Sequence, residues 1–219
     1  MERFPVGAVV FDLDGVLVDS MPAIRAYWTD WAKRHNVSPE RVLASLHLTA
    51  EELVRRFAPS LDARAEARAT AEGQAKIESG ITALNGGPAL IERLPPDRWA
   101  VVTSGRRLLA LQHLAVGHLP VPGVLITAED TPLGKPNPAG YRLAAKRLGL
   151  PPGACLAIED SPAGVRAARD AGMAVIAVTN THPASELREA NGVIDSLTRI
   201  ELAIDQDSHA LEVVLSRAI

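Results

Sequence analysis

The chain has 219 residues, of which 47% are hydrophobic and 22% are charged, and its formal net charge at pH 7 is -3. These proportions are those of a soluble globular protein, and the length is enough for one sizeable core and a smaller second unit. The acidic balance excludes a general attraction to nucleic acid or to an anionic membrane, so an anionic ligand would have to be attracted by local charges.

The first predicted element is a buried strand that ends in two carboxylates. The apolar run from Val9 to Phe11 predicts the strand, and Asp12 and Asp14 follow it at the end where open parallel sheets carry their chemistry. Two anions this close repel each other unless a cation neutralises them or one of them holds a proton. The pair therefore fits a nucleophile with a neighbouring acid or base. The simpler alternative is a turn in which both side chains cap backbone donors.

A block of helices is predicted from about residue 20 to residue 80. Residues 22–35 form the first candidate helix, Ser38 begins the second, and residues 49–52 have the pattern of a capping box. The run 61–79 is rich in Ala, Arg and Glu and is strongly helix-forming. No strand is predicted within this block.

After residue 86 the pattern alternates between short apolar strands and helices. The predicted strands lie near residues 99–103, 124–127, 155–159 and 174–178. Such alternation favours right-handed crossovers and a parallel sheet covered by helices on both faces, with the first strand in the middle of the sheet. The predicted fold class is therefore α/β, with a central parallel sheet flanked by helices and a helical block inserted after the first strand.

Polar side chains also follow the later strands. Thr103 and Ser104 end one strand, where hydroxyls and backbone N–H groups can meet an anion. Lys135 lies in a loop stiffened by Gly and Pro, so it loses little flexibility when it meets a phosphate. Glu159 and Asp160 end a strand just before a helix. Taken singly, these residues also have structural explanations, namely helix capping, solvation and interaction with a helix N-terminus.

Taken together and in this order, the polar segments resemble the four motifs of the haloacid dehalogenase superfamily of phosphatases. The segments are Asp12-Leu13-Asp14-Gly15, Thr103, Lys135 and Glu159-Asp160, and Ile158 to Val165 resembles the sugar-phosphatase and β-phosphoglucomutase-like branch. The resemblance extends from about residue 6 to residue 197. It implies a Rossmann-like core of residues 1–17 and 84–219, with a helical cap of residues 18–83 that is hinged near residues 17–20 and 80–86.

The resemblance also implies a role for each residue. Asp12 would be the nucleophile that forms an aspartyl-phosphate. Asp14 would donate and then accept a proton, which requires a pKa nearer the working pH than that of a free Asp. Thr103, Ser104 and Lys135 would hold the phosphate of the substrate.

A magnesium ion is the implied cofactor, because the available ligands are hard oxygens. The implied metal site consists of Asp12, the backbone carbonyl of Asp14, and Asp160. Glu159 would either bind the metal directly or contact the residues that bind it.

The implied activity is Mg2+-dependent hydrolysis of small sugar or polyol phosphates through an aspartyl-phosphate. One alternative is a β-phosphoglucomutase-like mutase, although Ile24 and Ala50 stand where mutases of this branch have a His and an Arg. An alternative of another class is a non-catalytic sensor of phosphosugars. A sensor, however, gains nothing from keeping a nucleophile and a proton donor.

Specificity is the least predictable property. The helical block offers His47, Glu51, Arg55 and Arg56 as candidates to face the sugar, and none of them is assigned as a substrate ligand. His113 is predicted only to pack or to lie at the surface.

The remaining predictions concern the tail and the cellular setting. Residues 204–219 read as an amphipathic stretch, either a last helix that packs Leu211, Val214 and Leu215 on the core or a dimer contact. With Cys155 as the single cysteine, no intrachain disulfide can form. No secretory leader or membrane span is recognised, so we expect a cytoplasmic protein, a monomer or weak homodimer.

Overall fold

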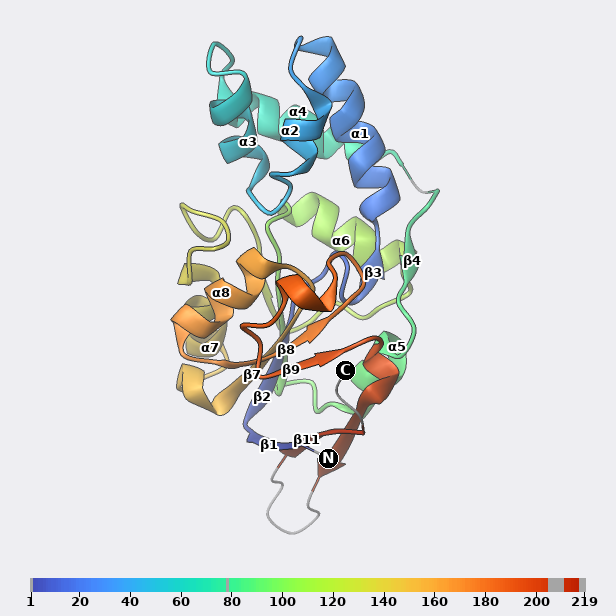
Figure 1. Cartoon of the computed structure of the whole chain (residues 1–219), viewed down its shortest axis with the longest axis vertical. Helices are drawn as coiled ribbons and strands as arrows, with labels where there is room; N and C mark the ends of the chain where they lie inside the picture. Colours follow the sequence, from blue (N-terminus) through green and yellow to red (C-terminus); the bar gives the residue numbers. More distant parts are fainter. Residues whose placement is uncertain (1, 78, 205–210, 217–219) are drawn as a thin grey trace.

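The computed structural model describes residues 2–77, 79–204 and 211–216 of the chain, and Figure 1 shows a group of helices above a sheet flanked by further helices. Within these residues, six parallel strands form the central sheet in the order β6-β5-β2-β7-β8-β9. Their bounds are β2 Ala8–Phe11, β5 Trp99–Val102, β6 Val124–Ile126, β7 Cys155–Glu159, β8 Ala174–Val178 and β9 Gly192–Ile194. The predicted α/β fold with the first strand inside the sheet is confirmed.

The strand β2 is apolar throughout because both faces of the sheet are covered. Ala8 and Val10 face α7 (Ala139–Arg147) and α8 (Pro162–Ala171) in one core cluster. On the other face, Val9 and Phe11 belong to the cluster that contains buried residues of α5 (Gly87–Arg93) and α6 (Arg107–Val116). The carboxyl end of β2 therefore opens between two layers of helices.

The helices above the sheet form a unit with its own core, centred on Trp28 and Trp31. These helices are α1 Met21–Arg34, α2 Pro39–Leu43, α3 Ala50–Phe57 and α4 Ala63–Gln74. Ser38 caps α2, and Thr49 forms the predicted capping box with Glu52 at the start of α3.

The helix predicted over residues 61–79 is shorter in the structure. The Asp62 carboxylate accepts the first free N–H groups, so α4 begins at Ala63, and it ends at Gln74. The following carbonyl of Ile77 accepts a hydrogen bond of 2.8 Å from the Gln112 side chain of α6. The segment that follows α4 is thus held against α6 of the core and does not continue the helix.

Two short strands join the helical unit to the rest of the chain. β3 (Val18–Asp19) and β4 (Thr82–Ala83) pair in antiparallel fashion, so both passages of the chain run side by side. The sequence predicted no strand here, because two residues show no periodicity. The predicted boundaries of the core and cap, and the hinge near residues 17–20 and 80–86, stay predictions.

The prediction of a last helix is wrong for the described part of the tail. β11 (Leu211–Leu215) is instead the middle strand of an antiparallel sheet, between β1 (Glu2–Val6) and β10 (Ile200–Ile204). Leu211, Val214 and Leu215 are buried as predicted. Residues 205–210 and 217–219 of the predicted stretch lie outside the described residues.

In the portion of the chain that the structure describes, we find no helix with the length and apolar character that crossing a membrane requires.

Candidate active site

The predicted site residues lie at the carboxyl ends of neighbouring strands. They comprise Asp12 and Asp14 after β2, Thr103 and Ser104 after β5, Lys135 in the loop between β6 and α7, and Glu159 and Asp160 at the end of β7. Parallel strands end at the same edge, so residues more than one hundred positions apart in the sequence meet there.

Lys135 connects two of the carboxylates. Its Nζ donates a short hydrogen bond to Asp12 Oδ1 and another, of 2.5 Å, to Glu159 Oε1. Burial would lower the pKa of Lys135, but the charges of Asp12 and Glu159 outweigh burial and hold the pKa above its ordinary value. The ammonium therefore stays charged although it is only 7% exposed.

Glu159 is fully buried and accepts hydrogen bonds from several donors. Besides Lys135, these donors are the hydroxyl of Tyr141 at 2.6 Å, the backbone N–H of Asp160 at 3.0 Å and the hydroxyl of Ser161 at 3.2 Å. Burial would raise the pKa of Glu159, but Lys135, the Tyr141 hydroxyl and the Asp160 N–H lower it. With its oxygens occupied in this way, Glu159 is well placed to fix Lys135.

Asp12 and Asp160 complete a buried acidic cluster with Glu159, in which one oxygen of each residue lies within 4.8 Å of the others. Burial, together with repulsion from Glu159 and Asp14, raises the pKa of Asp12 to about 7 despite the nearby Lys135. Burial and the charges of Asp12 and Glu159 raise that of Asp160 well above its ordinary value. The donor set is one of hard oxygens, which suits a divalent cation.

Gly15 allows the first loop to approach this cluster. Its φ is +90°, and a Cβ atom at this position would overlap with the Asp160 carboxylate. Both observations require glycine after Asp14.

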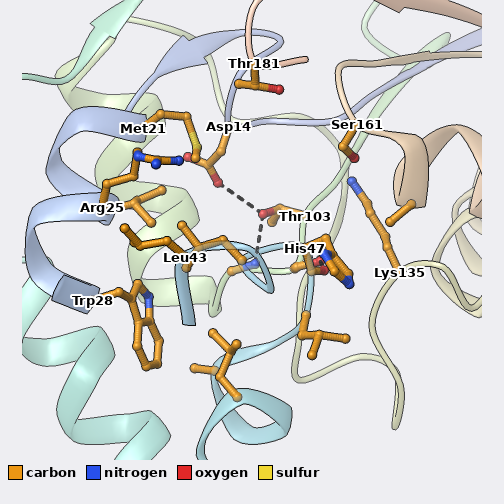
Figure 2. A pocket seen from close by; sticks show the side chains of 18 of the residues that line it. Asp14, Met21, Arg25, Trp28, Leu43, His47, Thr103, Lys135, Ser161 and Thr181 are labelled. Carbon is orange, nitrogen blue, oxygen red and sulfur yellow. Dashed lines mark hydrogen bonds between the residues drawn. The ribbon is translucent and has the colours of Figure 1, made fainter. Parts of the chain in front are cut away.

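The Asp14 carboxylate has a separate set of partners. Oδ1 accepts a short hydrogen bond from Ser20 and faces His113 Nδ1 at 2.7 Å. Oδ2 accepts a hydrogen bond of 3.4 Å from Thr103 Oγ1, which Figure 2 shows as a dashed line. Burial would raise the pKa of Asp14, but the charge and hydrogen bond of His113 and the hydrogen bond of Ser20 lower it. The expectation of a pKa nearer the working pH is therefore wrong for this state of the site, because the sequence could not reveal His113 as a neighbour.

His113 is the functional candidate that sequence reasoning missed. We predicted that it only packs or lies at the surface, yet its buried ring contacts Asp14. His113 lies among apolar residues of α6, 99 positions from Asp14, and no local motif marks it. Tyr141 was missed for the same reason, and Ser20, although only six positions from Asp14, was missed because no motif marks it.

The second predicted loop links the site to the helical unit. Thr103 Oγ1 accepts a hydrogen bond of 2.9 Å from the backbone N–H of Gly105. The hydroxyl of Ser104 donates instead to the backbone carbonyl of His47, at 3.0 Å. The Ser104 side chain thus faces the helical unit.

A cavity of about 720 Å3 lies between the helical unit and the sheet edge. Figure 2 shows Arg25 and Trp28 projecting from α1 on one side of the cavity and Lys135 on the other. His47 lines this cavity as well.

The other residues proposed to face the sugar have different contacts. Glu51 and Arg55 form an ion pair, with side chains 25% and 60% exposed, and the Arg56 guanidinium lies 5.5 Å from the centre of the Phe57 ring. Arg25, which the sequence did not single out, takes a place in the cavity wall.

Comparisons with known proteins agree with this architecture. The sequence profile described as haloacid dehalogenase-like hydrolase matches residues 6–172. Hexitol phosphatase A of Escherichia coli is 40% identical over 199 residues, covering 87% of this chain and 91% of the relative. Glycerol-1-phosphate phosphohydrolase 2 of Saccharomyces cerevisiae is 31% identical over 201 residues, covering 84% and 79%. A β-phosphoglucomutase structure from Clostridium difficile has a TM-score of 0.75 at 22% identity, covering 90% and 93%. The last likeness concerns the fold alone.

Proposed function

The chain belongs to the haloacid dehalogenase-like hydrolases, and from this premise we propose that it hydrolyses small sugar or polyol phosphates through an aspartyl-phosphate. The observation that carries the proposal is the meeting of Asp12, Lys135 and Asp160 beside Asp14, beneath a cavity of about 720 Å3. Such a site offers a nucleophile, a phosphate-binding cation and a proton donor within one small volume.

In the first step, a carboxylate oxygen of Asp12 attacks phosphorus. The bond from phosphorus to the sugar oxygen breaks, and that oxygen takes a proton from the Asp14 carboxyl group. Lys135, the Thr103 hydroxyl and the Ser104 backbone N–H hold the phosphoryl oxygens by charge and hydrogen bonds.

In the second step, a water oxygen attacks the phosphorus of the aspartyl-phosphate. Asp14 takes the proton that the water loses, the bond between Asp12 and phosphorus breaks, and inorganic phosphate leaves. Asp14 thus returns to the protonated form that the next cycle requires.

The residues of the acidic cluster fit a divalent cation. Oxygens of Asp12 and Asp160, with the backbone carbonyl of Asp14, would hold Mg2+, which would neutralise charge on the phosphoryl group when bound. The raised pKa values of Asp12 and Asp160 support this assignment, because both carboxylates can ionise together only if positive charge compensates them. Glu159 then serves chiefly to hold Lys135.

The cavity wall supports hydrolysis over the mutase reaction. A mutase must hold a phosphosugar through two transfers, and its branch uses a His and an Arg where this chain has Ile24 and Ala50. Both residues line the cavity, and neither side chain can donate a hydrogen bond to a sugar. Arg25 and His47 are among the polar groups of the wall that could bind a short hydroxylated chain. The hexitol phosphatase and the glycerol-1-phosphate phosphohydrolase are relatives that act on such compounds.

The test is release of inorganic phosphate from a panel of hexitol, hexose and glycerol phosphates, measured with magnesium and with EDTA. We expect turnover of at least one of these compounds, loss of turnover in EDTA, and loss in Asp12→Asn with the thermal unfolding temperature retained. Isomerised phosphosugar without phosphate release would indicate a mutase. Tight binding without either product would indicate a sensor and overturn the proposal.

A further inference from the structure

We propose that His113 is a positioning residue, which holds the carboxyl group of Asp14 toward the oxygen of the departing sugar. This inference rests on the proposed function, because it concerns the proton that Asp14 supplies. His113 lies outside the motif segments by which the sequence resembles its family.

The contact is built from buried groups. His113 is 3% exposed, and its Nδ1 lies 2.7 Å from Asp14 Oδ1, within hydrogen-bond distance. In the described part of the chain, this bond is the polar contact that the His113 ring makes. Among the described residues, the polar contact of the ring is thus directed at Asp14.

Three chain segments hold the Asp14 carboxyl group. Ser20 follows β3, Thr103 follows β5, and His113 comes from the last two turns of α6. Since Thr103 Oγ1 lies 3.4 Å from Oδ2, at the long end of the hydrogen-bond range, its hold on Asp14 is weak. The carboxyl orientation depends mainly on the two donors at Oδ1, and His113 is the bulkier and more rigid of these.

The position of α6 gives this contact its significance. In Figure 1, α6 lies between the sheet and the helical unit, and His113, like Asp14, lines the cavity. A packing role alone would be met by an apolar side chain, since its helix neighbours Leu109 and Leu114 are both buried. An apolar side chain would leave Asp14 Oδ1 with Ser20 alone and free to turn away from the substrate.

Two variants separate positioning from packing. His113→Leu fills a similar space without a donor, whereas His113→Asn returns an N–H donor at the same distance along the side chain as Nδ1. Leu114→Val is the matched control, because it weakens packing at the adjacent buried position of the same helix.

The readout is kcat/KM for two kinds of substrate. A sugar or polyol phosphate needs a proton on its leaving oxygen, whereas p-nitrophenyl phosphate releases a phenolate that needs little help. We expect His113→Leu to lower kcat/KM for the best sugar or polyol phosphate by about tenfold to a hundredfold, and for p-nitrophenyl phosphate by less than about threefold. His113→Asn should recover most of the loss.

The outcomes distinguish the two proposals. If the wild type releases phosphate from no compound in the panel, the proposed function fails. If the wild type is active, the positioning role is overturned when His113→Leu lowers kcat/KM equally for both substrates or for neither of them. An equal loss that Leu114→Val reproduces would assign His113 to packing.

Discussion

At the scale of single residues, the site is governed by how buried charges are compensated. Lys135 is shared by Asp12 and Glu159, and Glu159 in turn is held by Tyr141 and by Ser161. A buried ion is costly unless each partner remains in place, so these side chains depend on one another.

Replacement of Glu159 by Gln removes one of the two anions that face Lys135. We expect this variant to lower the free energy of unfolding by about 3 kcal/mol, because it breaks a fully buried ion pair and its hydrogen bonds. The matched control is Glu189→Gln, since Glu189 pairs with Arg166 and Arg169 at the surface and is 51% exposed. In urea denaturation the control should lower the free energy of unfolding far less than Glu159→Gln does, because solvent screens an exposed ion pair. Equal costs would contradict the special role of the buried pair.

The sequence was sufficient to predict the residues that follow buried strands. Asp12 and Asp160 could be found because a polar group directly after an apolar run is locally visible, and Lys135 could be found because Gly and Pro mark its loop. His113 and Tyr141 could not be found, because each lies in an ordinary helix and becomes relevant only through a neighbour far along the chain. Contact between side chains is a property of the tertiary structure.

At the scale of elements, the first turn of α8 is fitted closely around the site. A Cβ atom on Gly164 would overlap with the Glu159 carboxyl group, and Ser161 caps the same helix through the Gly164 N–H at 3.1 Å. The helix can therefore pass over the end of β7 only if residue 164 has no side chain.

Gly164→Ala should displace either α8 or the Glu159 carboxylate. We expect a loss of about 3 kcal/mol or more in the free energy of unfolding, and a large drop in phosphate release, because Glu159 holds Lys135. Gly123→Ala serves as the control, since the nearest atom to its added Cβ is the Pro96 carbonyl oxygen at 4.0 Å. Urea denaturation measures the free energy of unfolding of both variants, and a phosphate-release assay measures their activity. A stable and fully active Gly164→Ala variant would contradict the close fit.

The elements also show where sequence reasoning stops. The five predicted strands of the sheet are apolar runs buried on both faces, so local composition reveals them. β11 pairs with β1 and β10, and β3 pairs with β4, through contacts between distant segments. For β11 the short run of apolar residues fits a helix and a strand equally well, and its partners decide the outcome.

At the scale of the whole molecule, the site lies where two units of the chain meet. The loop that carries Ser104 contacts the carbonyl of His47, and the Gly134 N–H, next to Lys135, donates to Glu52 at 3.3 Å. Both loops that we propose to bind the phosphate therefore touch the helical unit directly.

Stability of the metal-free protein should depend on pH through Asp12. Its pKa is raised from 3.8 to about 7, so the folded protein binds more protons than the unfolded chain between these values. The resulting stabilisation is complete at low pH and is lost as the pH rises through about 7.

We therefore expect magnesium to raise the thermal unfolding temperature more at about pH 8 than at about pH 5, because the cation binds ionised carboxylates. In EDTA, the Asp12→Asn variant should lack the part of the pH dependence that Asp12 contributes. Thermal unfolding of both proteins with and without magnesium measures this difference. A magnesium effect that is equal at both pH values would argue against a metal site at Asp12.

The central claim is that Asp12 carries the phosphoryl group between substrate and water. The direct measurement is to quench the enzyme with acid during turnover, reduce it with borohydride, which converts an aspartyl-phosphate into homoserine, and determine the mass of the peptide that contains residue 12. We predict homoserine at Asp12, aspartate at Asp14, and no conversion in Asp12→Asn. Rapid phosphate release from an enzyme whose Asp12 stays unmodified, or conversion at a different residue, would contradict the claim.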